Sequence, residues 1–215
     1  LNGLPHGKGS FRGRNREDVD YCYTGQWSNG AFDGEGELLY QSELYYDRVG
    51  TFRRGRFAPT AAELLAAYGS REPQFSLSQA QLDYLEEFPE LLDPAQSVPD
   101  YREGRYRSLY TGEVNYESFL ASPEKYPEGW ILFYNYMILD MWEDSSFGEE
   151  YKVTRITACN TVYANPVECY IFGEVPNLTA KSRFTMYGYP MAVSSYTSAD
   201  GEAVQCIVLL VGSMG

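Results

Sequence analysis

Tyr23-Thr-Gly25-Gln-Trp27-Ser-Asn-Gly30-Ala-Phe-Asp-Gly34-Glu-Gly36 is the stretch that decides the fold of this chain. Tyr23, Gly25 and Trp27 alternate with a period of two, so they share one face of a β-strand. Asn29-Gly30 predicts a tight turn, because both residue types accept a positive φ. The stretch therefore predicts a β-hairpin whose returning strand, at Gly34 and Gly36, has room for the next hairpin to stack closely.

Two partial copies of this stretch flank it in the same glycine frame. Gly50-Thr-Phe52-Arg-Arg-Gly55 overlays the first half, 25 residues further on. Gly3-Leu-Pro-His-Gly7-Lys-Gly9 overlays the second half, 27 residues earlier. A period in this range is typical of repeat architectures, so residues 1–57 are predicted to form stacked hairpins. Because the earlier copy begins at its second half, we expect the intact protein to extend further at its N-terminus.

The pattern Tyr-x-Gly-x-Trp-x-x-Gly-x-x-x-Gly-x-Gly resembles the MORN-repeat family, with a full match in the middle copy. The third copy has Phe52 in place of Trp and lacks the last glycines. This resemblance implies a twisted, elongated sheet used in protein association or near membranes, and it implies no catalytic residues. We interpret the aromatic residues as core, with a binding stripe as the alternative: Tyr23, Trp27, Tyr46 and Phe52.

The remainder of the chain divides into an acidic helical linker over 58–105 and a β-domain over 106–215. Helices are expected at 61–68, capped by Thr60 and ended by Gly69, at 79–88, and at 116–126. Five strands are expected at 129–139, 151–157, 167–172, 182–189 and 204–211. The fold class is therefore mainly β with a few helices (α+β), with the MORN-like hairpins followed by a small β-barrel.

The second half also resembles the OB-fold-like domains of bacterial envelope and secreted proteins. The resemblance rests on Met186-Tyr187-Gly188 and on Ser195-Tyr-Thr-Ser-Ala-Asp-Gly201 before a last strand. It implies an OB-like barrel and a location in the cell envelope or outside the cell, with a cytoplasmic location as the alternative. An OB barrel often presents a ligand-binding face.

Charge argues against two classes of partner. Residues 1–57 hold 8 basic and 8 acidic side chains, residues 58–150 hold 5 and 18, and residues 151–215 hold 4 and 4. No segment has the cationic excess that nucleic acids or anionic membranes attract, so we expect neither partner. The acidic cluster between Asp140 and Glu150 suggests either a Ca²⁺ site or, as we prefer, a solvated loop.

The chain has four cysteines and one histidine, His6, which limits the metal sites and nucleophilic catalysis that it could support. They leave no zinc motif, and no nucleophile-and-base motif is recognisable, so neither a metal nor a cofactor is expected. The cysteines are either buried thiols or include a bridge between Cys159 and Cys169 across a turn at Ala164-Asn165-Pro166. We therefore expect a non-enzymatic interaction or scaffold module with a protein partner. The alternatives are a small-molecule or glycan-binding OB-type domain and, more remotely, an unrecognised hydrolase.

Overall fold

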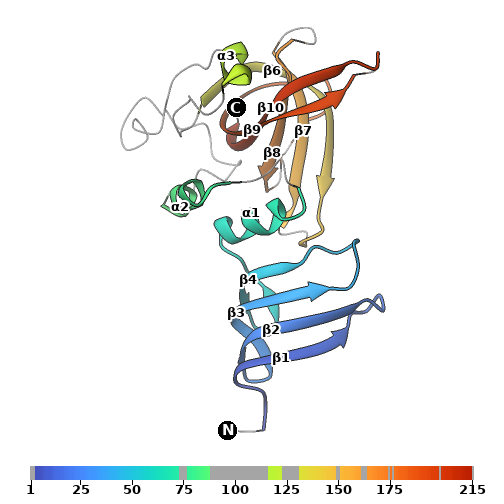
Figure 1. The fold of residues 1–215 in the computed structure, drawn as a ribbon, viewed down its shortest axis with the longest axis vertical. Helices are drawn as coiled ribbons and strands as arrows, with labels where there is room; N and C mark the ends of the chain where they lie inside the picture. The colour runs from blue at the N-terminus through green and yellow to red at the C-terminus, as the bar shows by residue number, and fades with distance from the viewer. Residues whose placement is uncertain are drawn as a thin grey trace. The chain divides into compact units, whose positions relative to one another are not determined.

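The computed structural model describes residues 3–72, 77–87, 116–122, 131–148, 151–160, 164–173, 175, 177–198 and 200–214. These residues are mostly β-strand with a few short helices, which confirms the predicted class (Figure 1). None of the helices in these ranges is long and apolar enough to cross a bilayer. The chain forms two compact units, Leu1–Pro73 and Gln74–Gly215.

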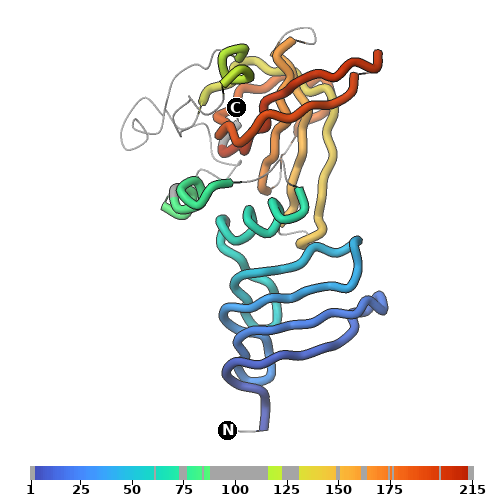
Figure 2. Tube along the Cα trace, in the orientation of Figure 1, coloured from blue at the N-terminus to red at the C-terminus, as the bar shows by residue number. Residues whose placement is uncertain are grey.

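The N-terminal unit is the predicted stack of hairpins. Its antiparallel sheet follows the chain in the order β1 (Gly7–Arg14), β2 (Asp20–Ser28), β3 (Ala31–Tyr40), β4 (Arg48–Arg53) and β5 (Arg56–Phe57). The trace in Figure 2 runs back and forth through this sheet, and each strand lies beside the one before it without a crossover.

The turns of two hairpins, at corresponding positions of the repeat, have the same backbone conformation. Asn29 and Gly30 have φ values of 49° and 84°, and Arg54 and Gly55 repeat them with 50° and 83°. This is the pair of positive φ values that a two-residue hairpin turn requires. The Gly30 amide donates to the Pro5 carbonyl at 3.0 Å, and the Gly55 amide donates to the Phe32 carbonyl at 2.8 Å. Each tip is thus tied to the repeat before it.

A row of four glycines crosses the sheet. The strand register pairs Gly9 with Gly25, Gly25 with Gly36, and Gly36 with Gly50. A Cβ on Gly36 would lie 2.4 Å from the Tyr23 hydroxyl oxygen, and one on Gly25 would lie 2.5 Å from the Gly36 Cα. The missing side chains therefore let the Tyr23 ring lie directly against the sheet.

Helix α1 (Ala61–Gly69) completes the N-terminal unit. The Glu63 amide donates to the Thr60 hydroxyl at 3.2 Å, and the Thr60 amide donates to the Glu63 carboxylate at 2.7 Å, which is a capping box. The helix is one residue longer than the predicted 61–68, so Gly69 lies inside it and not just after it. Gly69 is its last helical residue, and Ser70 is the C-cap with a right-handed φ of −66°.

The C-terminal unit contains two helices and a closed ring of five strands among its described residues. The helices are α2 (Gln79–Glu87) and α3 (Tyr116–Ala121). The strands are β6 (Ile131–Asp144), β7 (Val153–Cys159), β8 (Val167–Phe172), β9 (Arg183–Thr197) and β10 (Ala203–Met214). Their order is β10-β8-β7-β6-β9, and β9 pairs back onto β10. Strands β8 and β10 run parallel, and every other pair is antiparallel.

All five predicted strands are present, but β6, β9 and β10 are longer than expected. Strand β9 runs on to Thr197, so the final turn lies at 198–202 rather than beginning at Ser195. The parts of the predictions that fall at 88–115, 123–130 and 149–150 lie outside the described residues. The acidic residues Asp140, Glu143 and Asp144 belong to β6 and not to a solvated loop. No cluster of three or more His, Cys, Asp or Glu that could hold a metal exists in the described ranges.

The inside of the ring is apolar. Alternating residues of the strands point inward and are fully buried, among them Ile156, Cys169, Ile171, Met186 and Leu209. Tyr116 of α3 and Phe119 beside it pack against the same core. The Tyr116 hydroxyl donates toward the carbonyls of Pro166 and Gln205, which ties the helix to the ring.

The structure contains no bridge between Cys159 and Cys169, because all four cysteines are free. The register of β7 and β8 places Cys169 opposite Ile156, three residues from Cys159. Equal distance from a turn therefore did not bring the two thiols face to face. The Cys169 sulfur instead lies 3.5 Å from that of Met186.

Candidate functional site: a groove on the hairpin sheet

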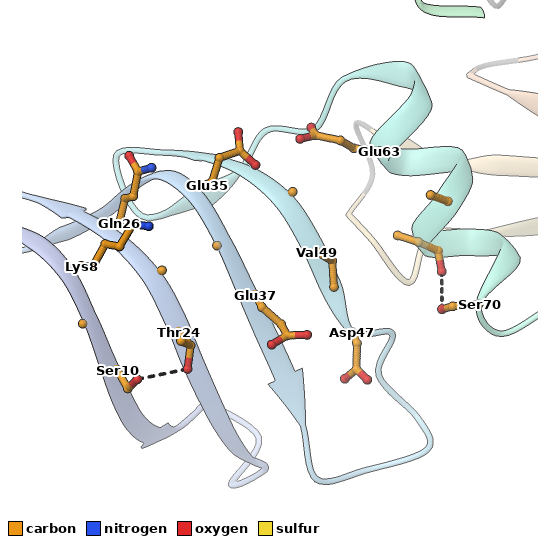
Figure 3. A pocket seen from close by; sticks show the side chains of 16 residues that line it. Lys8, Ser10, Thr24, Gln26, Glu35, Glu37, Asp47, Val49, Glu63 and Ser70 are labelled. Atoms are coloured by element: carbon orange, nitrogen blue, oxygen red, sulfur yellow. Dashed lines mark hydrogen bonds between the residues drawn. The ribbon is translucent and has the colours of Figure 1, made fainter. Parts of the chain in front are cut away.

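An open groove of about 1060 Å³ crosses the hairpin sheet of the N-terminal unit. It passes over strands β1 to β4 and reaches one side of helix α1 (Figure 3). Its walls carry polar and small side chains, and its centre follows the glycine row. The side chains that line it, apart from the glycines, are Lys8, Ser10, Thr24, Gln26, Glu35, Glu37, Asp47, Val49, Glu63, Ala66, Ala67 and Ser70.

Strand alternation sets two rows of side chains on this face, one on either side of the glycines. In one row Lys8 pairs with Gln26, and Glu35 pairs with Thr51. In the other row the register joins Ser10 to Thr24, Thr24 to Glu37, and Glu37 to Val49. Since two residues of a strand span about 7 Å, the rows flank a floor of that width made of glycine backbone.

The groove is acidic although its unit has balanced charge. Four carboxylates line it, those of Glu35, Glu37, Asp47 and Glu63, against the single ammonium of Lys8. None of the four forms an ion pair with a basic side chain of the described residues. The basic residues are used elsewhere, as for Arg14, which pairs with Asp18 at 3.0 Å and Asp20 at 2.6 Å near the β1–β2 turn.

Hydrogen bonds hold three of these four carboxylates in place. The Thr51 hydroxyl lies 3.1 Å from a Glu35 carboxylate oxygen and 3.0 Å from one of Glu63. A hydroxyl carries one proton, so it can satisfy only one of the two acceptors at a time. The amide of Tyr40 donates to the Asp47 carboxylate at 2.9 Å. The acids are thus positioned without being neutralised.

The aromatic residues singled out in the sequence lie mostly in the packing on the other face of the sheet. Tyr23 is fully buried, stacks on Phe32 with 3.7 Å between ring centroids, and meets Phe52 edge-on at 5.1 Å. Burial raises the pKa of the Tyr23 hydroxyl, and nearby Asp33 adds to this effect. Trp27 packs edge-on against Tyr23, and its indole N–H donates to the Gly9 carbonyl at 3.3 Å.

Tyr46 is separate from this cluster. Its ring stacks on Tyr68 of α1 at 5.8 Å, and the Arg71 guanidinium lies 5.0 Å from the ring centroid. The structure therefore brings Tyr23, Trp27 and Phe52 together and leaves Tyr46 apart. Tyr23 and Phe52, which are 0% and 1% exposed, have no surface to offer a ligand.

Sequence reasoning missed the groove acids. Alternation across Glu35-Gly36-Glu37 is a local signal that would have placed both carboxylates on the face opposite Tyr23. No local signal brings Thr51 and Glu63 to the same place, because their positions depend on strand pairing and on how α1 packs against β4.

The strand ring has a smaller hollow of about 280 Å³, lined by residues that include Tyr116, Phe133, Tyr136, Asn160 and Asn165. Ligand pockets commonly measure about 300–1,000 Å³. The described residues that line it include no pair of carboxylates, which a glycoside hydrolase would need. The groove of the hairpin unit is therefore the stronger candidate site.

Comparison with known proteins supports the hairpin assignment alone. A family model described as MORN repeat matches residues 1–16 and 23–43. No curated protein matches the chain, and no solved structure matches it. In those two segments, which form most of strands β1 to β3, this chain is similar to MORN repeats.

Proposed function

We propose that this chain is a non-enzymatic protein-interaction module whose partner docks in the groove of the hairpin sheet. The observation that carries this proposal is an open groove with positioned polar side chains on a rigidly stacked sheet. MORN repeats are generally involved in contacts with proteins or membranes, and the match to that family covers three of the strands that form the groove.

The chemistry of the groove agrees with binding. The two serine hydroxyls that line it have no base beside them, since that of Ser10 bonds to the Thr24 hydroxyl at 3.2 Å and that of Ser70 donates to the Ala67 carbonyl at 2.7 Å. The Thr51 hydroxyl lies between the carboxylates of Glu35 and Glu63, with no histidine beside it. A hydroxyl nucleophile needs an adjacent general base, usually a histidine. His6 is the one histidine of the chain and does not line the groove.

The C-terminal ring is proposed as an OB-type barrel. Its support is a set of five strands in which β6, β7 and β8 form a meander, β9 returns to β6, and the parallel pair β8 and β10 closes the ring. A location in the cell envelope or outside the cell belongs to the same proposal. The free cysteines give that location no support, because disulfides are typical of oxidising compartments.

The test is affinity enrichment with the whole chain carrying Ser10→Trp, which places an indole in the groove. Arg12→Trp is the matched control, because Arg12 lies two residues along the same strand, on the same face, and outside the groove lining. Quantitative mass spectrometry should find proteins that are depleted by Ser10→Trp and retained by Arg12→Trp. Equal recovery with both variants would remove the groove as the docking site.

A further inference from the structure

We infer that the groove receives an extended peptide segment bearing Lys or Arg side chains from a partner protein. This inference rests on the proposed function and adds the chemistry of the partner. Two features of the groove carry it: its charge and the apolar floor between its charged side chains. Hydrogen bonds to Thr51 fix where two of the carboxylates lie.

Charge selects a cation. The carboxylates of Glu35, Glu37, Asp47 and Glu63 lie toward β3, β4 and α1, and Lys8 lies at the β1 end (Figure 3). Because no basic side chain of the described residues forms an ion pair with these acids, their negative charges are available to pair with a ligand. Complementary charge of this kind steers association and suppresses partners of the wrong sign.

The shape of the groove suits long cationic side chains. Its floor is glycine backbone, and Ala66 and Ala67 of α1 form part of the wall. Lys and Arg lay their methylene stems on apolar surface and keep their charged ends in polar surroundings. The two rows of side chains are about 7 Å apart, so the carboxylates of Glu35 in one row and Glu37 in the other flank the floor on both sides.

Thr51 fixes the position of two of the carboxylates. Its hydroxyl lies 3.1 Å from an oxygen of Glu35 and 3.0 Å from one of Glu63, and its one proton serves only one of them at a time. An ammonium or guanidinium group supplies several N–H donors, and charge-assisted hydrogen bonds to carboxylates are the stronger kind. A Lys or Arg head at this end of the groove can therefore bond to both carboxylates.

Other ligands of the groove are disfavoured by the same residues. Anionic lipid headgroups would meet four carboxylates, whereas their binding is driven by Lys and Arg clusters. A divalent cation needs several converging oxygen ligands, and the described part of the chain has no cluster of three or more acidic, His or Cys side chains suited to a metal.

The test is fluorescence anisotropy of the whole chain with a fluorescein-labelled peptide of alternating Lys and Ser. A peptide of alternating Glu and Ser and vesicles containing phosphatidylserine serve as alternative ligands. We expect the Lys peptide to bind, to weaken as NaCl rises, and to exceed both alternatives. The double variant Glu35→Gln/Glu37→Gln should weaken it at least about tenfold, since each lost charge pair removes a favourable contact.

The double variant Glu17→Gln/Glu43→Gln is the matched control. It removes the same two charges from exposed sites of the same unit outside the groove lining, and we expect it to change binding by less than about twofold. Equal losses in both double variants, preference for the Glu peptide or the vesicles, or no binding of the Lys peptide would overturn the inference. If Ser10→Trp still removes natural partners in that case, the proposed function stands and only the partner's chemistry is wrong.

Discussion

At the scale of single residues, Gly36 and Tyr23 depend on each other. An added Cβ on Gly36 would lie 2.4 Å from the Tyr23 hydroxyl oxygen and 2.6 Å from two of its ring carbons. Tyr23 cannot move away freely, because its ring stacks on Phe32 and its hydroxyl donates to the Gln26 carbonyl at 2.9 Å. The space above this glycine is therefore already occupied by a fixed ring.

We predict that Gly36→Ala lowers the free energy of unfolding of the hairpin unit by about 1–3 kcal/mol, as overpacking of a filled site does. Gly9→Ala, in the same glycine row, is the control. Its Cβ would be 3.4 Å from the Trp27 indole nitrogen, an ordinary contact, so its effect should stay within about 0.5 kcal/mol. Chemical denaturation measures both. Equal losses would show that the Tyr23 ring is not what excludes a side chain at Gly36.

Cysteine reactivity is a second prediction at this scale. Cys22 is partly exposed, whereas the other three cysteines are buried, and burial raises the pKa of Cys169 well above its ordinary value and that of Cys206 to about 11. The thiolate is the reactive form, so both effects slow alkylation. Mass spectrometry after iodoacetamide treatment without reductant should find one label on the native chain and four in denaturant. Two labels missing in denaturant would instead indicate a disulfide.

At the scale of elements, features set by neighbouring residues could be predicted from the sequence, whereas the register between distant strands could not. Asn29-Gly30 and the alternation that begins at Tyr23 predicted the hairpin correctly, because turn geometry and strand faces are set within a few residues. The Thr60 cap was found for the same reason. The alternative of a Cys159–Cys169 bridge was wrong because it required a particular register of β7 and β8, which the length of the loop did not fix.

The capping box of α1 gives a prediction for one element. Thr60→Ala removes the acceptor for the Glu63 amide and should cost about 0.5–2 kcal/mol, with faster hydrogen exchange at the amides of Ala61–Gly69. Thr60→Ser keeps the hydroxyl and should exchange like the natural chain. If Thr60→Ser exchanges as fast as Thr60→Ala, the hydroxyl bond is not what holds the start of this helix.

At the scale of the whole molecule, the acidic and basic side chains are separated between faces of the folded chain and not between segments of the sequence. Residues 1–57 are neutral overall, yet the acids line the groove while several bases lie at turns and edges, as Arg14 does beside Asp20. A count along the sequence located the excess acid in residues 58–150 and could not detect this separation. It becomes visible only when strand pairing places residues far apart in sequence on one face.

Burial raises the pKa values of ionisable groups in both units, but the larger shifts lie in the C-terminal unit, which predicts that this unit loses more stability in alkali. The C-terminal unit buries Cys169, Cys206, Tyr116 and Tyr136, and burial is the largest cause raising the pKa of each. Between an unfolded value of 9.0 and a folded value of about 11, Cys206 ionises only in the unfolded chain. Stability is therefore full below pH 9 and falls as the pH rises through this range.

Calorimetry at pH values of about 7.5 and 10.5 should show this loss in the transition of the strand ring, with Cys206 alone contributing about 1–2 kcal/mol. Cys206→Ala is the decisive variant. It removes a buried side chain and should therefore lower the free energy of unfolding at both pH values. Because it also removes the thiol that ionises, the free energies of unfolding at the two pH values should differ by less than in the natural chain. If the difference is unchanged in Cys206→Ala, this thiol is not kept protonated by the fold. The alkaline loss would then have to come from the remaining buried groups, and Tyr136→Phe would test one of the tyrosine contributions in the same way.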